Sequence, residues 1–504
     1  MKTTRLWSAA MLLALTAGSL GAQDLAAYEK KTTVRKLDNG LTVIIQERHE
    51  APVFSYATVV NTGSAQEVPG ITGLAHMFEH MAFKGSQHIG TTNYAEEKIA
   101  LQNVENAYSA YDTERRKPVG RDEVKVAQLE KSWHDAIAAA DKFVIPNEFT
   151  KIVDAAGGSG LNAGTGSDTT EYFFSLPSNK FELSAFLESE RFYDPVFREF
   201  YKERDVVQEE RRMRTESNPV GRLILQFSGT SFIAHPYGRP TIGWSSDLQS
   251  FSATDAMNFF KKYYVPANTV IAIVGDVNPA EAMPVIEKYF GRLPKSPLPE
   301  PLRTVEPPQN AERQVILHET SQPIYVEGYH RPAATDSDNP TYDTIAMLMS
   351  AGRTSRLYRS LVRDQKLAAE AGGFNGFPGE KYPNLFVFFG FTTPGHVATD
   401  LKTPIQAEID RLKTQDVSPE ELQSVKTRVK AGLLRGLDSN AGMAQQLAET
   451  QTLYGDWREL FREVDRINAV TPADIRRVAN KTFDVNNRTI AYVDSAKIPA
   501  GGAK

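Results

Sequence analysis

The chain has 504 residues, of which 41% are hydrophobic, and this is enough apolar material for two or three domains with cores of their own. Its formal net charge of −5 argues against the basic footprint of a nucleic-acid-binding protein, so we expect no nucleic-acid partner. It contains no cysteine, which excludes disulfides, thiolate zinc ligands and cysteine nucleophiles. Any metal ion must therefore be bound by His, Asp or Glu.

The first 22 residues have the pattern of a secretory signal peptide. Lys2 and Arg5 precede a mostly apolar stretch at 6–15, and small residues follow at 17–22. A retained membrane anchor is the alternative, but the apolar stretch is shorter than the roughly 20 residues that span a bilayer. We therefore expect cleavage near Ala22, a periplasmic or secreted protein, and no membrane span after cleavage.

Two segments of the chain resemble one another and indicate an internal duplication. Residues 252–274 and 471–493 match at six positions without a gap, and chance similarity is the alternative explanation. Each segment has the pattern of a capped helix, a turn with Asn and a buried strand. Residues 291–312, between the halves, are rich in proline and favour an extended linker.

These patterns predict an α+β fold with two duplicated α/β-sandwich halves, each a largely antiparallel sheet packed with helices. The expected domains are an N-terminal half at 30–290 and a C-terminal half at 313–496. The first half carries an extra segment at about 94–153, which reads as two helices separated by the turn signal at 117–120. We predict a helical hairpin insertion. It either shapes a substrate entrance or is a solvated structural insertion, and we favour the second interpretation.

The stretch GLAHMFEHMAFKGS, residues 73–86, carries two histidines four positions apart. On a helix His76 and His80 project from one face and aim at one point. Two histidines and one carboxylate, with a fourth position open to water, form the arrangement of a hydrolytic zinc site. Glu79, directly before His80, can flank the metal without binding it and accept a proton from that water. The alternative is a histidine pair that lines a core, but the spacing favours the metal site.

A third ligand is expected from the stretch REFYKERDVVQEERRMR, residues 198–214. On a helix Glu203 and Glu210 share a partly apolar stripe. Carboxylates on such a stripe are costly to bury unless they are paired or bind a metal ion. Neighbouring arginines are the alternative partners. The spacing alone does not separate Glu203, Glu209 and Glu210 as the third ligand.

With these motifs the sequence resembles the pitrilysin/insulinase family of zinc metallopeptidases, the inverted zincins. The resemblance covers nearly all of the chain after the signal segment. The motifs that carry it are GLAHMFEHM at 73–81, LNA at 161–163, DTTEY at 168–172, ERDVVQEE at 203–210, HPYG at 235–238 and VGD at 274–276.

The resemblance implies that His76, His80 and Glu210 bind one zinc ion per chain and that Glu79 is the general base. Glu203 matches the family's acid that orients a ligand histidine. Glu210 follows His80 by 130 positions, which exceeds the usual family gap, and the helical insertion accounts for the excess.

The resemblance also implies where a substrate binds. Asn162 and Ala163 match the segment beside the family's catalytic cleft. The following strand, at about 168–176, would offer its edge to an extended peptide. Because main-chain pairing depends little on side-chain identity, broad peptide specificity is expected.

The second half has no HxxEH motif, and residues 349–358 resemble the family's inactive domain. Full-length relatives enclose a chamber with four such domains, whereas this chain has two. The rest of the chamber is therefore expected from a homodimer, or from a heterodimer with a related subunit that lacks the zinc motif. The resemblance implies a zinc-dependent endopeptidase that hydrolyses peptides or unfolded polypeptides. The alternative is a non-catalytic or dedicated-processing subunit of a two-chain peptidase complex.

Overall fold

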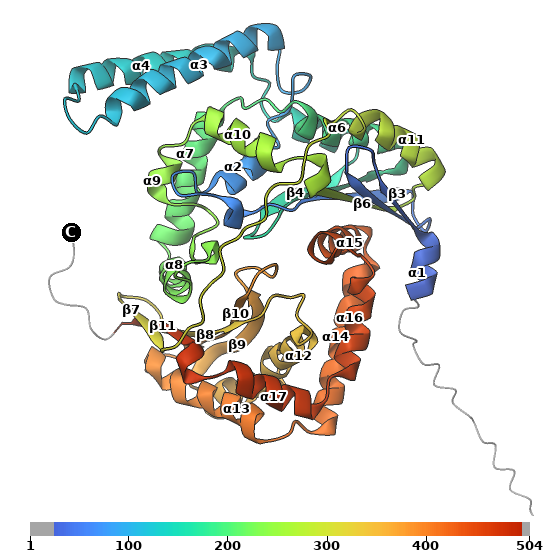
Figure 1. Cartoon of the computed structure of the whole chain (residues 1–504), viewed down its shortest axis with the longest axis vertical. Coiled ribbons are helices and arrows are strands. Elements are labelled where there is room, and N and C mark those ends of the chain that lie inside the picture. Colours follow the sequence, from blue (N-terminus) through green and yellow to red (C-terminus); the bar gives the residue numbers. More distant parts are fainter. Residues whose placement is uncertain (1–24, 496–504) are drawn as a thin grey trace, which may run out of the picture.

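The computed structural model of the protein describes residues 25–495, so the expected signal peptide, residues 1–22, lies outside the described residues. Two α/β halves, each built on one sheet, face each other in this part of the chain (Figure 1). The predicted fold of two duplicated halves is confirmed. None of the helices within residues 25–495 is long and apolar enough to cross a membrane.

The first half contains a six-stranded sheet with one parallel pair of neighbours. The strand order is β1-β2-β6-β3-β5-β4, and β2 and β6 form the parallel pair. The strands are β1 (Thr32–Lys36), β2 (Thr42–Glu47), β3 (Val53–Val60), β4 (Ser159–Thr165), β5 (Thr170–Pro177) and β6 (Thr269–Gly275).

This order corrects one prediction, because the strand that follows residue 168 does not lie at the sheet edge. It is β5, which pairs with β3 on one side and with β4 on the other. Residues 159–165 fold back on β5 across the short turn at 166–169 and occupy the position that β5 was expected to expose. The edge strand is therefore β4, which contains Asn162 and Ala163.

The second half repeats this design with five strands. The order is β7-β11-β8-β10-β9, and again one pair, β7 and β11, is parallel. The strands are β7 (Arg313–His318), β8 (Ile324–Arg331), β9 (Ala368–Phe377), β10 (Asn384–Thr392) and β11 (Arg488–Asp494). Residues 294–312, which connect the halves, form no helix or strand.

Helices pack on both sheets. Those of the first half are α1 (Leu25–Lys31), α2 (Leu74–Met81), α3 (Tyr94–Arg115), α4 (Glu123–Ala140), α5 (Glu148–Ala155), α6 (Phe181–Tyr193), α7 (Phe200–Arg211), α8 (Pro219–Ser231), α9 (Ser245–Leu248), α10 (Ala253–Tyr263) and α11 (Pro279–Phe290). Those of the second half are α12 (Asn339–Ser350), α13 (Lys402–Thr414), α14 (Pro419–Asp438), α15 (Asn440–Tyr454), α16 (Glu459–Ala469) and α17 (Pro472–Thr482).

The two segments that resemble one another in sequence occupy equivalent places. They form α10 followed by β6 and α17 followed by β11, and each helix begins with a capping box. In the turn after each helix an Asn side chain binds the backbone. The Nδ2 of Asn268 and of Asn487 donates to the carbonyl oxygen five residues earlier, at 3.0 and 2.9 Å. An Asn side chain thus makes the same hydrogen bond in both halves, as an internal duplication predicts.

One helix from each half packs on the sheet of the other half. α15 lies against β3 and β6 of the first sheet, where Leu447 is fully buried in a cluster with Val59 and Ala272. α8 lies against the second sheet, where Phe227 packs beside Gly328 of β8. A Cβ atom at Gly328 would lie 2.6 Å from the Phe227 ring, so only glycine permits this approach. Figure 1 shows both helices between the two sheets.

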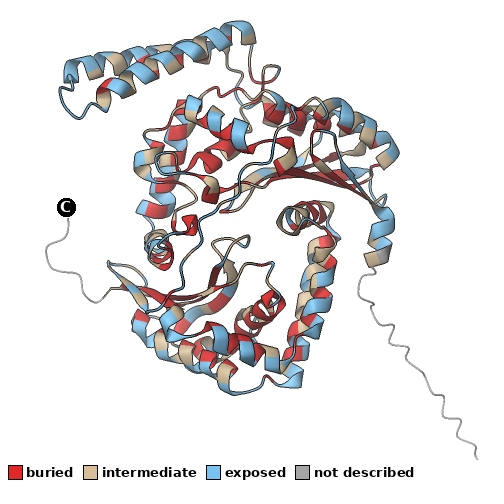
Figure 2. Cartoon of the chain, viewed as in Figure 1, coloured by how far each residue is buried: buried red, intermediate tan, exposed pale blue. Residues whose placement is uncertain are grey.

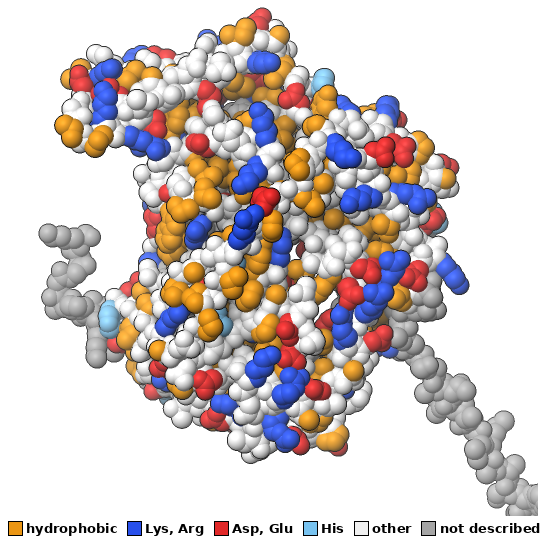
Figure 3. Space-filling view, viewed as in Figure 1, with side chains coloured by type: hydrophobic (Ala, Val, Ile, Leu, Met, Phe, Trp, Pro, Cys, Tyr) orange, Lys and Arg blue, Asp and Glu red, His pale blue; other side chains and the backbone are white. Residues whose placement is uncertain are grey.

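Helices α3 and α4 form the predicted helical hairpin. It projects from the first half on the side away from the second half, and most of its surface is exposed (Figure 2). Its few buried residues include Glu97, Tyr108 and Trp133. On the face of the molecule shown in Figure 3, Lys and Arg side chains are interspersed with Asp and Glu side chains.

Candidate metal centre

The helix α2, which carries both histidines of the HxxEH motif, begins at a backbone position that requires glycine. Gly73 precedes it with φ 95°, and a Cβ atom there would lie 2.8 Å from the carbonyl oxygen of Ile242. The carboxylate of Glu67 accepts hydrogen bonds from the backbone N–H groups of Gly73 (2.8 Å) and Ala75 (2.7 Å). Glu67 therefore satisfies the free N–H groups at the start of the helix, a role that the sequence analysis missed.

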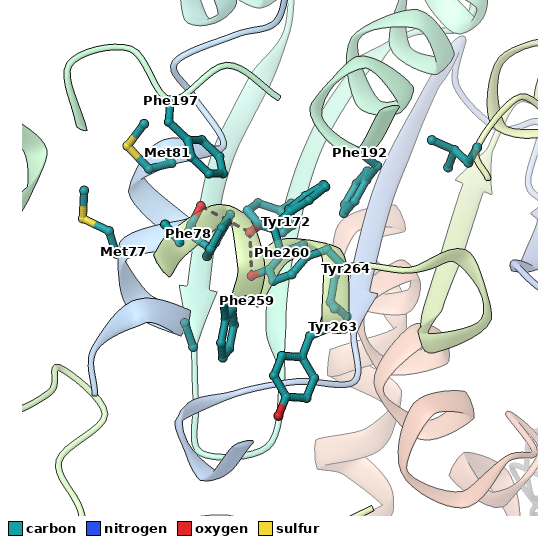
Figure 4. Packing of buried hydrophobic residues seen from close by; sticks show 14 of the residues in the cluster. Met77, Phe78, Met81, Tyr172, Phe192, Phe197, Phe259, Phe260, Tyr263 and Tyr264 are labelled. Carbon is teal, nitrogen blue, oxygen red and sulfur yellow. Dashed lines mark hydrogen bonds between the residues drawn. The ribbon is translucent and has the colours of Figure 1, made fainter. Parts of the chain in front are cut away.

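The apolar face of α2 anchors it in the core of the first half. The Phe78 ring stacks on the rings of Phe259 and Phe260 of α10, with centroid distances of 5.9 and 5.7 Å (Figure 4). The Tyr172 hydroxyl donates to the Phe78 carbonyl oxygen at 3.5 Å. Because this side of the helix is fixed, the histidines on its other side are held in place relative to α7.

The packing of α2 against α7 brings three potential metal ligands together. The Nε2 atoms of His76 and His80 lie 3.6 and 3.4 Å from one oxygen, Oε2, of Glu210. One donor atom from each residue lies within 4.8 Å of the other two. Within residues 25–495 this is the one place where three such side chains come close enough to hold a metal ion.

These donor atoms suit zinc. Tetrahedral zinc with bonds of about 2.0–2.1 Å places its ligand atoms about 3.3 Å apart, close to the 3.6 and 3.4 Å between the two imidazoles and Glu210. Burial, together with the charges of His80 and Arg214, lowers the pKa of His76 to about 3. The imidazole is therefore neutral at pH 7, as a metal ligand must be. Glu79 is half-buried on the same turn of α2 as His80.

Glu203 lies behind His80. Its Oε2 atom is 3.3 Å from His80 Nδ1, and its Oε1 atom is 2.5 Å from Lys84 Nζ. Although burial opposes this, the contacts with His80 and Lys84 lower the pKa of Glu203. Burial likewise lowers the pKa of His80, but the hydrogen bond to Glu203 and the charges of Glu203, Glu210 and Glu79 outweigh it and raise that pKa. A carboxylate in this position fixes the orientation of a ligand histidine.

Lys84 is a member of this network that the sequence analysis missed. It contacts Glu203 and also Glu199, at 3.0 Å, so it links the two carboxylates. No helical signal in the sequence marked it, because α2 ends at Met81 and Lys84 follows in the turn after the helix.

The structure also separates the three glutamates that spacing alone left equivalent. Glu210 points its Oε2 atom at the histidines, and its Oε1 atom contacts Arg214 at 2.7 Å. Glu209 is turned outwards and binds the exposed Arg212 with both oxygens, at 2.8 and 2.6 Å. Of the three, only Glu210 joins the cluster of potential ligands.

Asn162 and Ala163 lie on the edge strand β4, opposite Phe173 and Tyr172 of β5. The Asn162 side chain is exposed, and Ala163 is half-buried. Helix α2, which carries both histidines, packs against β4. Their role in substrate binding stays a prediction.

The fold thus carries one candidate metal site among its described residues, and comparison with known proteins gives the family. Residues 42–114 match the family described as insulinase (peptidase family M16), and residues 250–429 match the M16 inactive domain. The chain belongs to the M16 family of peptidases, and the predicted family is confirmed.

Similar proteins include the zinc protease PqqE of Helicobacter pylori, which is 26% identical over 493 residues that cover 96% of each chain. The uncharacterized zinc protease YmxG of Bacillus subtilis is 21% identical and covers 92% of this chain and 98% of its own. The crystal structure of a protease from Helicobacter pylori has a TM-score of 0.76 and 27% identity, over 92% of this chain and 99% of that one. The periplasmic protease PqqL of Escherichia coli shares the fold, with a TM-score of 0.67 and 17% identity, and this chain matches 48% of it.

Proposed function

We propose that the protein is a zinc-dependent endopeptidase that hydrolyses peptides or unfolded polypeptides. The convergence of His76, His80 and Glu210 on one point, with Glu79 on the same helical turn as His80, carries this proposal. The names of the related zinc proteases support it. A bound zinc ion would polarise the scissile carbonyl group and acidify the attacking water.

The side chains of this chain would divide the remaining work. Glu79 would accept a proton from the attacking water and pass it to the amine that leaves. Glu203 would hold His80 in the orientation that its ligand role needs, since it contacts the Nδ1 atom and leaves Nε2 towards Glu210. An extended substrate would add to the sheet at β4, where Asn162 and Ala163 lie.

We further propose that a second chain completes the enclosure around the substrate, either as a homodimer or with a related subunit that lacks the zinc motif. One relative, from Arabidopsis thaliana, is named as a probable mitochondrial-processing peptidase subunit beta, and it is 23% identical over 471 residues. The N-terminal residue pattern supports export to the periplasm or beyond. A non-catalytic or dedicated-processing subunit is the alternative function.

The decisive experiment compares Glu79→Gln with wild type on a peptide library, with the zinc content measured in both. We expect one zinc ion per chain in both proteins and a loss of cleavage of about 10²–10⁴-fold in the variant, the range of general acid–base catalysis. Glu209→Gln is the matched control, since Glu209 faces away from the cluster and binds Arg212. A zinc-loaded Glu79→Gln chain that cleaves as fast as wild type would contradict this mechanism. A zinc-loaded wild type that cleaves nothing would favour the non-catalytic alternative.

A further inference from the structure

The hairpin α3–α4 is joined to the ligand helix α7 by one buried arginine. Arg204 follows Glu203 directly in α7, so the two side chains leave the helix about 100° apart. Glu203 faces α2 and the metal cluster, whereas Arg204 faces the hairpin and is only 5% exposed. Nothing in the zinc chemistry proposed above uses this arginine.

Arg204 lies in a cage of aromatic rings to which both hairpin helices contribute. The centre of its guanidinium group is 4.9 Å from the ring centroid of Tyr201, 5.2 Å from that of Tyr108 and 5.7 Å from that of Trp133. Tyr108 belongs to α3 and Trp133 to α4. The Nη1 atom of Arg204 also donates to the Tyr108 hydroxyl, at 2.9 Å, and to the Phe251 carbonyl oxygen, at 3.1 Å.

No carboxylate lies within ion-pair distance of Arg204 among the residues that the structure describes. Its charge is therefore stabilised by ring faces and by neutral oxygen atoms, an arrangement that suits the planar guanidinium group and that lysine does not reproduce. Such a contact is directional, because the planar group has to stay between the rings. A small rotation of α7 would break it.

Two further contacts tie the same end of α7 to the hairpin. The Tyr201 hydroxyl donates to Glu105 of α3 at 2.6 Å. Just before α7, Arg198 pairs with Glu97 of α3 at 2.8 Å, and both side chains are fully buried. Arg198 also donates to the carbonyl oxygens of Ser86 and Ile89, in the segment that follows α2. The hairpin base thus holds the start of α7 and the chain beyond the histidine helix in one network.

We infer that Arg204 is a positioning residue through which the hairpin sets the place of Glu203 and Glu210 opposite the two histidines. Glu210 lies six residues further along α7, or about 9 Å along the helix axis. A helix held at its first turns by the hairpin therefore carries Glu210 as a rigid extension. The inference rests on the proposed zinc site and gives the inserted hairpin a task that does not require contact with a substrate.

The experiment measures zinc affinity by competition with a chelator in Arg204→Met, which keeps an apolar side chain of similar length but removes the charge. We expect zinc binding to be about tenfold weaker, within the range observed when residues that support metal ligands are mutated. We also expect an altered visible spectrum of the cobalt-substituted protein. Arg212→Met, at an exposed arginine directly after α7, is the matched control, and its zinc affinity should stay within about twofold of wild type. Arg204→Lys should be intermediate, because it keeps the charge without the planar group.

Glu203→Gln provides the reference for a direct contact with a ligand histidine. The inference is overturned if Arg204→Met binds zinc within about twofold of wild type with an unchanged cobalt spectrum, even if its zinc-free melting temperature falls. If Arg204→Met does not fold, Trp133→Leu in the hairpin tests the same contact, with the same expected loss and the same contradicting result. A wild type that binds no zinc would overturn the proposed function as well. Weak binding by Glu203→Gln beside normal binding by Arg204→Met would overturn this inference alone.

Discussion

The two halves of the chain share a strand design, yet within residues 25–495 only the first gathers three potential metal ligands. In the first half α2 follows β3 and carries His76 and His80. In the second half α12 follows β8 and carries no histidine, and its buried residues include Ile345, Leu348 and Met349. The shared scaffold alone therefore does not create the candidate metal site. The site depends on a few side chains on two helices.

The second ligand helix shows the same contrast. Helix α14 follows β10 and α13 in the order in which α7 follows β5 and α6. Its Glu421 binds Arg356 of its own half, at 2.7 and 2.9 Å. A carboxylate on this helix thus serves an ion pair in one half and faces two imidazoles in the other. The hairpin insertion also belongs only to the half with the cluster, as its proposed positioning role requires.

The largest effect is expected from exchanging the carboxylate in each half. Glu210→Gln should weaken zinc binding by more than about a hundredfold, beyond the range of changes behind the ligands, and should remove peptidase activity with it. Glu421→Gln, the matched change in α14, should leave the zinc content at one ion per chain. Metal analysis after dialysis and a peptide-cleavage assay measure both results.

Equal zinc loss in the two variants would show that fold damage, not ligand loss, explains the first. Full zinc retention in Glu210→Gln would remove that residue from the proposed site.

The exchange of helices between the halves can be tested through stability. Leu447 of α15 and Leu223 of α8 are both fully buried, each against the other half's sheet. Each substitution by alanine should lower the free energy of unfolding by about 2–5 kcal/mol, the usual effect of a cavity in a core. Because each helix supports both halves, urea unfolding should remain a single transition that shifts as a whole. Two transitions, with each variant shifting only one of them, would contradict this interlocked packing.

A smaller effect concerns how the two equivalent helices begin. α2 is held by Glu67, which binds backbone N–H groups, whereas Asp338 at the start of α12 binds Arg477 (2.7 Å) and Lys481 (3.1 Å) of α17. The hydrogen bond from Arg477, with help from Lys481 and against burial, lowers the pKa of Asp338. Its contribution is therefore present above the unfolded pKa of about 4 and is lost as the pH falls through the lower folded pKa.

Asp338→Asn should accordingly cost about 1 kcal/mol at pH 7, since its two partners are half exposed. The difference from wild type should be smaller at pH 3 than at pH 7, because Asp338 becomes protonated as the pH falls, and urea unfolding at the two pH values would show this. A difference of the same size at both values would mean that the charge of Asp338 is irrelevant.

Much of the candidate site could be predicted because it depends on local geometry. The spacing of His76 and His80 places them on one helical face in any helix. The third ligand could not be separated from Glu203 and Glu209 by spacing, because the rotation of α7 about its axis is set by packing partners such as the hairpin. Without the family resemblance the sequence would have left that choice open.

The fold was predictable to a similar depth. The repeated helix–turn–strand segment indicated two halves, but the edge strand was misplaced because β4, with the sequence SGLNAGT, has few residues typical of strands. The exchange of α8 and α15 was not visible in the sequence either. Apolar periodicity shows that a helix is buried, but it does not show which sheet covers it.

This crossed packing has a consequence for how the chain can move. Helix α8 of the first half packs on the second sheet, and α15 of the second half packs on the first sheet. A protease cut within 294–312 would therefore leave two fragments that stay associated. The linker therefore connects the halves without acting as a hinge, because rotation about it would expose two apolar interfaces to water at the same time. If a second chain completes the enclosure as proposed, the opening that admits a substrate would take place where the two chains meet.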